Sequence, residues 1–353
     1  MRLWKRNFLI YVVFNFWFIV EAERNVTQNV TEMLPATTAN PLRNMTSSLE
    51  DTSTGESRNG TTDEIGQQKN PLPKSCGIQN VTIKGRLMGG EPAKLGEFPW
   101  LARLMYKNNA SNKIFGCSGF LISSKFVLTA AHCLESEGLG PVFEVHLGEH
   151  NTKTKVDCIE KNATCADKVK ILRVNETIPH PSYNITSEDH HHDIGLIYLR
   201  KRVKMTLYVS PICLIDKLDF EPFEYWLSGW GKTKTENETS IKMKVSIPPY
   251  PHHNCTKKYS KLKVPMKIID KQLCAGGQRN KDSCAGDSGG PLMLVVNGTR
   301  WFAAGVVSYG RRCGKEGWPA IYTNIMSYND WIKNTMLKYQ NQKEKFKVKY
   351  PVL

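Results

Sequence analysis

The most informative stretch of the chain is Asp282-Ser-Cys-Ala-Gly-Asp-Ser288-Gly-Gly-Pro291. A serine hydroxyl is a poor nucleophile until a base can take its proton. The glycines around Ser288 let backbone N–H groups crowd a developing oxyanion, where fixed dipoles contribute most. A Gly-Asp-Ser-Gly sequence alone is weak evidence, so a base and its partner must be found elsewhere in the chain.

Two other segments offer a base and an acid for this serine. They are Leu128-Thr-Ala-Ala-His132-Cys133 and Asp193-Ile-Gly-Leu-Ile-Tyr-Leu199, an acid at the start of an apolar strand. A neutral imidazole accepts a proton at pH 7, and a buried carboxylate fixes its tautomer and stabilises the imidazolium. Asp189 and Asp287 are alternative acids, but Asp189 lies in a polar loop and Asp287 adjoins the serine. We therefore predict a triad of His132, Asp193 and Ser288.

The pattern of short apolar runs predicts an all-β fold. Runs such as Ala303-Ala-Gly-Val-Val-Ser-Tyr309 are separated by Gly and Pro, which is typical of a barrel or sandwich. One helical pattern stands near the end, where apolar residues recur at spacings of three and four between Trp331 and Tyr339. Asn329 or Ser327 is the expected N-cap of this helix. The lysine-rich chain after Gln340 is expected to fray.

Together, the three segments resemble the trypsin-like serine proteases of the chymotrypsin family. The resemblance covers roughly three quarters of the chain and implies two packed six-stranded antiparallel β-barrels with a C-terminal helix. The first barrel would span about residues 87–204 and the second about 205–323, within a peptidase domain of residues 87–340. The resemblance also implies that His132 is the general base, Asp193 its orienter and Ser288 the nucleophile. The N–H groups of Gly286 and Ser288 would form the oxyanion hole.

The same resemblance implies that the enzyme cuts after Arg or Lys. Asp282, six residues before the serine, would pair with the substrate cation, and Ser283 beside it would tolerate either side chain. Ser308 and Gly310 would pair with the substrate backbone, although the family more often has Trp between them. Ala320 stands where the family usually has Gly lining the pocket. We therefore expect a narrower pocket and a selective enzyme.

An activation site is visible in the sequence Arg86-Leu87-Met88-Gly89-Gly90. It resembles the site where the family is cut after a basic residue, freeing an apolar amine. The Leu87 amine would insert and pair with Asp287, which would assemble the oxyanion hole and the pocket. Leu-Met replaces the usual Ile-Val, with similar volume. Arg86 implies activation by another trypsin-like protease or by the enzyme itself; the alternative is that Arg86 is an ordinary exposed loop residue.

In an oxidising compartment, ten cysteines imply five disulfides, but spacing alone leaves the connectivity open. The resemblance implies the pairs Cys76–Cys213, Cys117–Cys133, Cys255–Cys274 and Cys284–Cys313. Cys158 and Cys165 remain and would close a small inserted loop. That loop is similar to one in the clip-domain proteases of arthropods, although the six-cysteine clip module itself is absent. Cysteines serving a zinc site are improbable in an oxidising compartment.

Two segments raise the question of a bound metal. Glu149-His-Asn151, with Asp157 and Glu160, resembles the calcium loop of the family. We expect that no cofactor is required for catalysis. The inserted cysteine loop interrupts the match, so a structural calcium is an alternative and not the main expectation. His190-His191-His192 is a candidate zinc patch, but consecutive residues point in different directions. We expect a solvated loop there and no metal among the site residues.

The N-terminal part of the chain indicates secretion. Basic residues precede a 13-residue stretch from Phe8 to Val20, broken by one Asn, and Val20-Glu21-Ala22 fits a signal peptidase. The stretch is too short for a bilayer of about 30 Å, which counts against the alternative of a signal anchor. Residues 23–86 are polar, with almost no aromatic side chains, and are expected to be a disordered pro-segment. Sequons begin at Asn25, Asn29, Asn44, Asn59, Asn80, Asn109, Asn162, Asn175, Asn184, Asn237, Asn254 and Asn297.

The charge balance argues against a nucleic-acid partner. Lys and Arg number 48 against 33 Asp and Glu, a net charge of +15. This excess is spread along the chain apart from the basic tail of residues 341–353, so no single footprint emerges.

We therefore predict a secreted, glycosylated zymogen of a serine endopeptidase that acts in an extracellular arthropod cascade of immunity, melanization, clotting or development. The expected partners are protein substrates cut after Arg or Lys, an upstream activating protease and a serpin-type inhibitor, with no stable membrane insertion. The alternatives are a digestive or venom trypsin, a catalytically silent homologue acting as a binding cofactor, and a mucin-like tethered surface protein.

Overall fold

The computed structural model describes residues 70–79, 90–107, 112–135, 140–159, 164–232, 238–279, 282–284, 286–311 and 313–349, with side chains to residue 341. These residues all belong to one unit of the chain, Gln67–Leu353. The predicted signal peptide, most of the pro-segment, the activation residues Arg86 and Leu87, and Glu160 lie outside the described residues.

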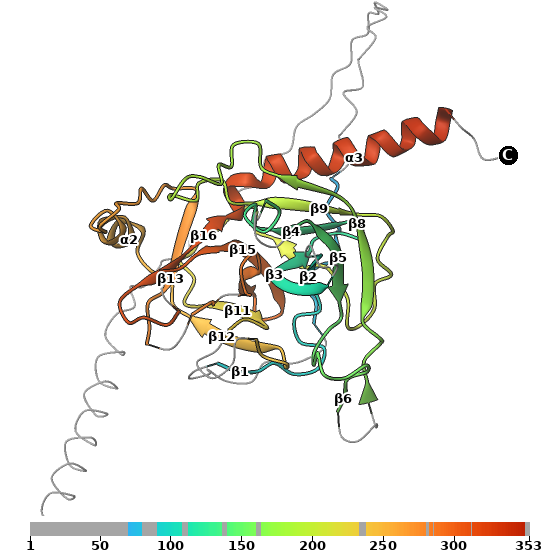
Figure 1. The fold of residues 1–353 in the computed structure, drawn as a ribbon, viewed down its shortest axis with the longest axis horizontal. Helices are drawn as coiled ribbons and strands as arrows, with labels where there is room; N and C mark the ends of the chain where they lie inside the picture. Colours follow the sequence, from blue (N-terminus) through green and yellow to red (C-terminus); the bar gives the residue numbers. More distant parts are fainter. Residues whose placement is uncertain are drawn as a thin grey trace, which may run out of the picture. The chain divides into compact units, whose positions relative to one another are not determined.

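The first barrel is a closed ring of six antiparallel strands (Figure 1). In ring order these are β2 (Leu101–Lys107), β3 (Lys113–Leu121), β4 (Phe126–Thr129), β9 (Gly195–Leu199), β8 (Lys170–Pro179) and β5 (Val142–Leu147). Leu104, Phe120 and Leu196 are completely buried. Burial of each such side chain contributes about 1.5–3 kcal/mol to the free energy of folding. The predicted six-stranded barrel is confirmed here.

The second barrel is built mainly from the residues that follow in the sequence. Its strands lie in the order β1 (Glu91–Pro92), β12 (Met243–Ile247), β11 (Tyr225–Gly229), β14 (Pro291–Val296), β15 (Arg300–Tyr309), β16 (Pro319–Asn324) and β13 (Gln272–Gly276), with β10 (Cys213–Leu214) parallel to β15. A bridge between Pro249 and Ala275 joins the chain after β12 to β13. Within the described residues this sheet differs from the six antiparallel strands expected, because it has eight strands and β10 is parallel to its neighbour. The expected boundary differs in one respect. β1 precedes the first barrel in sequence but pairs with β12 of the second.

The last helix, α3 (Asn329–Lys349), follows a 3₁₀ turn at Ile325–Tyr328. Ile332 and Met336 of the predicted apolar face are completely buried. The helix continues past Gln340, where fraying was expected, because Lys, Glu and Gln are good helix formers. Within the described residues, neither α3 nor the shorter α2 (His252–Tyr259) could cross a membrane.

The N-cap prediction for this helix was wrong. The side chain of Asn324 caps the 3₁₀ turn by accepting a 3.2 Å hydrogen bond from Met326 N. Asn329 instead donates its side-chain amide to the carbonyl of Ile215 at 2.7 Å. The preceding turn already supplies helical backbone, so the capping residue moves upstream of it.

One aromatic core joins the two barrels. Trp100, just before β2, lies 6.1 Å from Trp301 of β15 between ring centroids, and Phe98 lies 5.2 Å from the same indole. The indole N–H of Trp100 donates to Met293 Sδ in β14 at 3.1 Å. A densely packed core of this kind has low compressibility, so it holds the loops at the junction of the barrels in fixed relative positions.

Candidate active site

His132 and Asp193 meet because their strands pair. His132 comes shortly after β4 and Asp193 shortly before β9, and these strands are antiparallel with Thr129 opposite Gly195. The Nδ1 atom of His132 lies 2.8 Å from Asp193 Oδ2, and the backbone N–H of His132 donates to Oδ1 at 2.9 Å. The carboxylate therefore accepts hydrogen bonds from both the ring and the backbone of the histidine. This fixes the tautomer in which Nδ1 carries the proton and Nε2 can accept one.

Asp193 is completely buried, and its neighbours keep it ionised. Ser308 donates its hydroxyl to Asp193 Oδ2 at 2.6 Å, and Thr323 donates to the Asp193 carbonyl at 2.7 Å. Burial by itself would raise the pKa of Asp193, but the charge and hydrogen bonds of His132 and the Ser308 hydroxyl hold it below the usual value. Burial likewise opposes ionisation of His132, and Asp193 nevertheless raises the pKa of this imidazole. The pair thus favours an imidazolium, the state a general base reaches after accepting a proton.

The alternative acid Asp189 has a different place. It accepts a hydrogen bond from Lys267 N at 2.7 Å, and its carbonyl accepts one from the side chain of Gln272 at 3.0 Å. Asp189 therefore ties its loop to the second barrel, while His132 takes Asp193 as its partner.

The loop around Ser288 is held against the end of β4. Ser118 N donates to the Ser288 carbonyl at 2.8 Å, and Thr129 donates its hydroxyl to the Ser118 carbonyl at 2.8 Å. Gly289 has φ +78°, and a Cβ there would collide with Thr129 Oγ1. Only glycine fits this close approach. Ser288 is thereby brought to the strand end from which His132 extends.

Gly286 carries the backbone turn expected of an oxyanion hole. Its φ is +96°, and its carbonyl accepts the Ser118 hydroxyl at 2.8 Å. Backbone N–H groups fixed on such a turn suit a developing oxyanion, because they need no reorganisation when the charge forms.

The carboxylate of Asp282 is held by two backbone N–H groups. Its Oδ1 accepts from Ser283 N at 2.9 Å and its Oδ2 from Gly314 N at 3.1 Å. Burial raises the pKa of Asp282 to about 6, the two N–H groups lower it, and the charge of Asp287 adds to the rise. No Lys or Arg of the described residues forms an ion pair with Asp282.

Gly310 and Ala320, both expected at the substrate pocket, lie close to each other. Ala320 is 1% exposed, and a Cβ built on Gly310 would lie 3.7 Å from the Ala320 Cβ. The methyl group of Ala320 therefore lies across from Gly310, and the narrow pocket stays a prediction.

Asp287 lies against two glycines. Its Oδ1 accepts from Gly231 N at 3.0 Å and its Oδ2 from Cys284 N at 3.0 Å. A Cβ on Gly229 or on Gly231 would collide with this carboxylate. Burial raises the pKa of Asp287 to about 6, although both N–H groups lower it. The pairing of Asp287 with the Leu87 amine stays a prediction, because Leu87 lies outside the described residues.

Two supporting residues escaped sequence reasoning. Ser118 holds both Gly286 and Ser288, and Thr323 holds the backbone of Asp193. A signal existed for Ser118, since it follows Cys117, whose expected disulfide partner Cys133 adjoins His132. The contact made by Thr323 spans 130 residues and left no trace in the sequence.

All five disulfides of the structure are the expected ones: Cys76–Cys213, Cys117–Cys133, Cys158–Cys165, Cys255–Cys274 and Cys284–Cys313. Cys158 and Cys165 close the hairpin of β6 (Cys158–Ile159) and β7 (Thr164–Cys165). The Sγ atoms of Cys117 and Cys133 lie near His132, but both are bonded in the disulfide and are not thiolate ligands.

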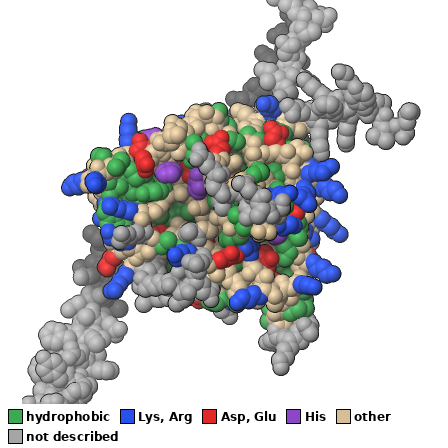
Figure 2. Space-filling model, viewed as in Figure 1, with side chains coloured by type: hydrophobic (Ala, Val, Ile, Leu, Met, Phe, Trp, Pro, Cys, Tyr) green, Lys and Arg blue, Asp and Glu red, His purple; other side chains and the backbone are tan. Residues whose placement is uncertain are grey.

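The three consecutive histidines make separate contacts. Some histidine side chains reach the surface on the face that Figure 2 shows. His190 stacks on Tyr309 with centroids 5.0 Å apart, and His191 Nε2 lies 2.6 Å from the Lys267 carbonyl. His192 stacks on His180 at 5.1 Å. Because the rings point to different partners, they do not form one metal site.

The residues of the calcium-like loop fit calcium only in part. Glu149 and Asp157 are both buried, and burial together with the charge of Asp157 raises the pKa of Glu149. Such crowded carboxylates suit a hard cation. However, Asp157 already accepts hydrogen bonds from His150 N, Asn151 N and the Thr154 hydroxyl. The cations of Arg103 and Lys242 also act on Glu149, so the chain supplies positive charge of its own there.

Comparisons with known proteins agree with this geometry. Residues 87–332 match the family described as Trypsin. The chain is 38% identical over 284 residues to phenoloxidase-activating enzyme 1 of Spodoptera litura, covering 78% of this chain and 74% of that protein. It is 40% identical over 271 residues to phenoloxidase-activating factor 1 of Holotrichia diomphalia, covering 75% and 73%.

A solved structure is similar as well. The crystal structure of Drosophila Grass, a clip serine protease of the Toll pathway, superposes with a TM-score of 0.61 at 31% identity, covering 74% of each chain. A family match over residues 87–332 and relatives that cover most of both chains leave no other assignment. The chain belongs to the trypsin family of serine proteases and is similar to the clip-type proteases of arthropod cascades.

Proposed function

We propose that the protein is a secreted zymogen of a serine endopeptidase that cuts proteins after Arg or Lys in an extracellular arthropod cascade. The single observation that carries the specificity is Asp282. Its buried carboxylate is held by two backbone N–H groups and has no cationic partner among the described side chains. An Arg or Lys side chain of a substrate would supply the missing charge.

The chemistry would run through the triad. Ser288 Oγ attacks the scissile carbonyl carbon, and His132 Nε2 takes the hydroxyl proton as the bond forms. Asp193, held by Ser308 and Thr323, stabilises the imidazolium. The carbonyl oxygen becomes an oxyanion facing the N–H groups of Gly286 and Ser288. His132 then returns the proton to the leaving amine, and water repeats the sequence on the acyl-enzyme.

Activation would follow cleavage between Arg86 and Leu87 by an upstream protease. The new amine would pair with Asp287. In the structure the Asp287 carboxylate accepts hydrogen bonds from the N–H groups of Gly231 and Cys284. Cleavage would divide the chain into a light chain, which ends at Arg86, and a heavy chain, which begins at Leu87. The disulfide of Cys76 with Cys213 would keep the two attached. Residues 70–79 are also held by backbone contacts, since Gly77 N donates to the Pro211 carbonyl at 2.8 Å and its carbonyl accepts Trp301 N at 2.9 Å.

The cascade role is supported by the relatives, of which two are named phenoloxidase-activating and one is a clip protease of the Toll pathway. A serpin-type inhibitor is part of the proposal, because an extracellular cascade needs an irreversible stop. The Asn-X-Ser/Thr sites and the N-terminal apolar stretch support a glycosylated, secreted product.

The test is hydrolysis of Arg- and Lys-based chromogenic peptides before and after cleavage at Arg86 by a trace of trypsin. We expect activity only after cleavage, and none with Ser288→Ala. N-terminal sequencing should give Leu-Met-Gly-Gly for the heavy chain. A wild-type chain that is fully cleaved yet inactive would overturn the enzyme proposal in favour of a binding cofactor.

A further inference from the structure

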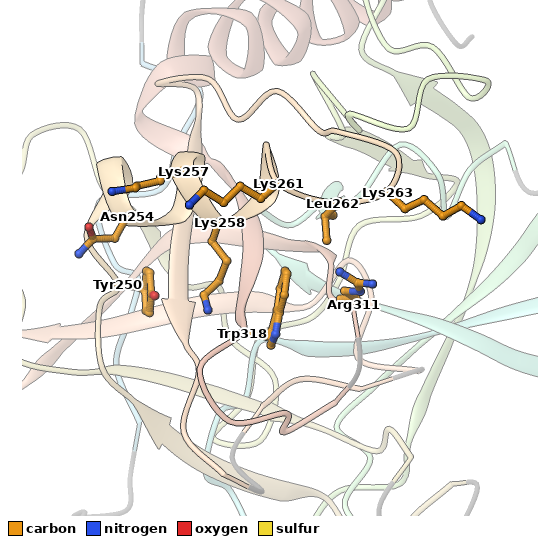
Figure 3. Close-up of a pocket in the computed structure, with 9 residues that line it drawn as sticks. All are labelled: Tyr250, Asn254, Lys257, Lys258, Lys261, Leu262, Lys263, Arg311 and Trp318. Carbon is orange, nitrogen blue, oxygen red and sulfur yellow. The ribbon is translucent and has the colours of Figure 1, made fainter.

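A basic hollow of about 500 Å³ lies beside α2 (Figure 3). We use this name for the space lined by Lys257, Lys258, Lys261, Lys263, Arg311 and Trp318, together with the uncharged residues Tyr250, Asn254 and Leu262. All four lysines come from α2 and the segment directly after it, whereas Arg311 follows β15 and Trp318 precedes β16. Figure 3 shows Lys258 extending down between Tyr250 and Trp318, with Arg311 on the other side of the indole.

The charges of the basic hollow are not balanced by the protein. None of its lining residues is acidic, and none of its five cations forms an ion pair with a carboxylate in the part of the chain that the structure describes. Lys258 Nζ lies 4.8 Å and Arg311 Cζ 4.7 Å from the Trp318 ring centroid, and Lys315 Nζ lies 5.3 Å from it. Like charges gathered around one ring repel each other, and a bound anion would relieve that repulsion.

The basic hollow adjoins the substrate cleft through both strands that border it. Arg311 directly follows Gly310, the residue expected to pair with substrate backbone. Trp318 directly precedes Pro319, whose carbonyl accepts the Tyr259 hydroxyl at 2.7 Å. The Tyr259 ring in turn lies 5.7 Å from Trp318 and 6.4 Å from Tyr309. One wall of aromatic side chains thus separates the cleft from the hollow.

A substrate strand antiparallel to Ser308–Gly310, with its Arg or Lys at Asp282, would run toward Arg311 on the N-terminal side of the scissile bond. We propose that the basic hollow binds acidic side chains of the protein substrate located about four to seven residues before that bond, at about 3.4 Å of chain per residue. This inference rests on the proposed endopeptidase function and names its preferred substrate. Cations at such a surface act mainly on the rate of association and on substrate binding, and salt screens their attraction for the acidic side chains.

The test uses the activated enzyme and two fluorogenic peptides that share one Arg-containing core. One peptide carries Asp and Glu four to seven residues before the scissile bond, and the other carries Asn and Gln. We expect kcat/KM to be roughly tenfold higher for the acidic peptide at low salt, through KM, with the advantage lost near 0.5 M NaCl. The readout is the ratio between the two peptides, so partial misfolding of a variant cancels.

Two variants make the test specific. Lys258→Gln combined with Lys261→Gln should bring the ratio close to one, whereas Lys201→Gln, an exposed lysine outside the hollow, should preserve it. A ratio of one in the wild type would overturn the inference. So would a high ratio that survives in the double variant, because the acids would then bind elsewhere. A wild-type ratio of one together with tight binding of dextran sulfate that the double variant loses would assign the hollow to a polyanion instead of substrate.

Failure of the enzyme proposal can be told apart from failure of this one. If neither peptide is cut after confirmed cleavage, the endopeptidase function fails. Fluorescence anisotropy of the labelled acidic peptide with the same cleaved chain then shows whether the basic hollow binds acidic side chains. Binding that weakens several-fold in the double variant but not in Lys201→Gln would support it, and equal binding of acidic and neutral peptides would overturn it.

Discussion

Asp287 rests on Gly231: its carboxylate accepts the Gly231 N–H at 3.0 Å, and the glycine has no space for a Cβ on that side. The same carboxylate accepts Cys284 N at 3.0 Å, next to the pocket residue Ser283. Asp287 therefore links the loop after β11 to the loop that carries Ser288. A change in the charge of Asp287 reaches the pocket and the serine together.

The first prediction follows from that link. Asp287→Asn, cleaved at Arg86, should lose kcat/KM by on the order of 100-fold or more, because a buried amine without its counterion costs about 3–5 kcal/mol. Hydrolysis of an Arg chromogenic peptide measures it, with N-terminal sequencing to show complete cleavage. Wild-type activity in the cleaved variant would contradict the proposed activation.

The second prediction concerns pH and Asp282. Burial raises the pKa of its carboxyl to about 6, so the group becomes neutral as the pH falls through that value and loses its attraction for a cation. The affinity of benzamidine, a small amidinium, should fall about tenfold between pH 7 and pH 5. Calorimetry on the cleaved Ser288→Ala chain removes any contribution from turnover. Affinity that stays flat over this range, or that persists in Asp282→Asn, would rule the mechanism out.

The third prediction concerns the width of the pocket. Ala320→Gly removes a methyl group that faces Gly310 across a short gap, and the larger guanidinium gains more from the space than the ammonium does. The ratio of kcat/KM for Arg over Lys peptides should rise by about tenfold, the scale of one methyl group in a specificity pocket. Ala304→Gly, another buried alanine in the second barrel, is the matched control. An unchanged ratio would show that Ala320 does not set the width.

The fourth prediction concerns the two-chain product. Cys76 and Cys213 are bonded, so cleavage at Arg86 should leave one band on a non-reducing gel and two on a reducing gel. In Cys76→Ser with Cys213→Ser the light chain has only non-covalent contacts, such as those of Gly77. Gel filtration in mild denaturant should then separate the two parts. Two bands from the cleaved wild type without reductant would refute the tether.

The fifth prediction concerns a buried ion pair. Lys244 Nζ lies 2.7 Å from Glu97 Oε1, with side chains 2% and 0% exposed. Glu97→Gln leaves the ammonium with the more exposed Glu91, so the free energy of unfolding should fall by about 3–5 kcal/mol. Glu97→Gln with Lys244→Met should recover much of that loss. Urea denaturation measures both, and a single variant as stable as the wild type would disprove the assignment.

Several features needed only the local sequence. The order His132, Asp193 and Ser288, with glycines about the serine, indicated the chemistry because acyl transfer needs those groups in those roles. The apolar sequences of β4 and β9 indicated buried strands, with the base just after the first and the acid just before the second. The cysteine pairs came from the family resemblance, which carries tertiary information that spacing lacks.

Other features depended on distant contacts. β1 crosses to the second barrel, and Asn324 caps the turn before α3 in place of the expected residues. The pairing of β1 with β12 and the hydrogen bond from Asn329, an expected cap, to the Ile215 carbonyl are contacts with segments far away in sequence. Helix caps and edge strands have weak local signals that such contacts override.

The sequence by itself determined the strand-rich fold and predicted the nucleophile with its base and acid, because motif chemistry and apolar patterning are local properties. Only the tertiary structure decided what supports and surrounds them. Ser118 and Thr323 reach the site from other strands, Ala320 closes in on Gly310, and the basic hollow joins Lys258 to Arg311 and Trp318. Charge, width and support depend on distances in space, and residues far apart in sequence acquire those distances only when the barrels close.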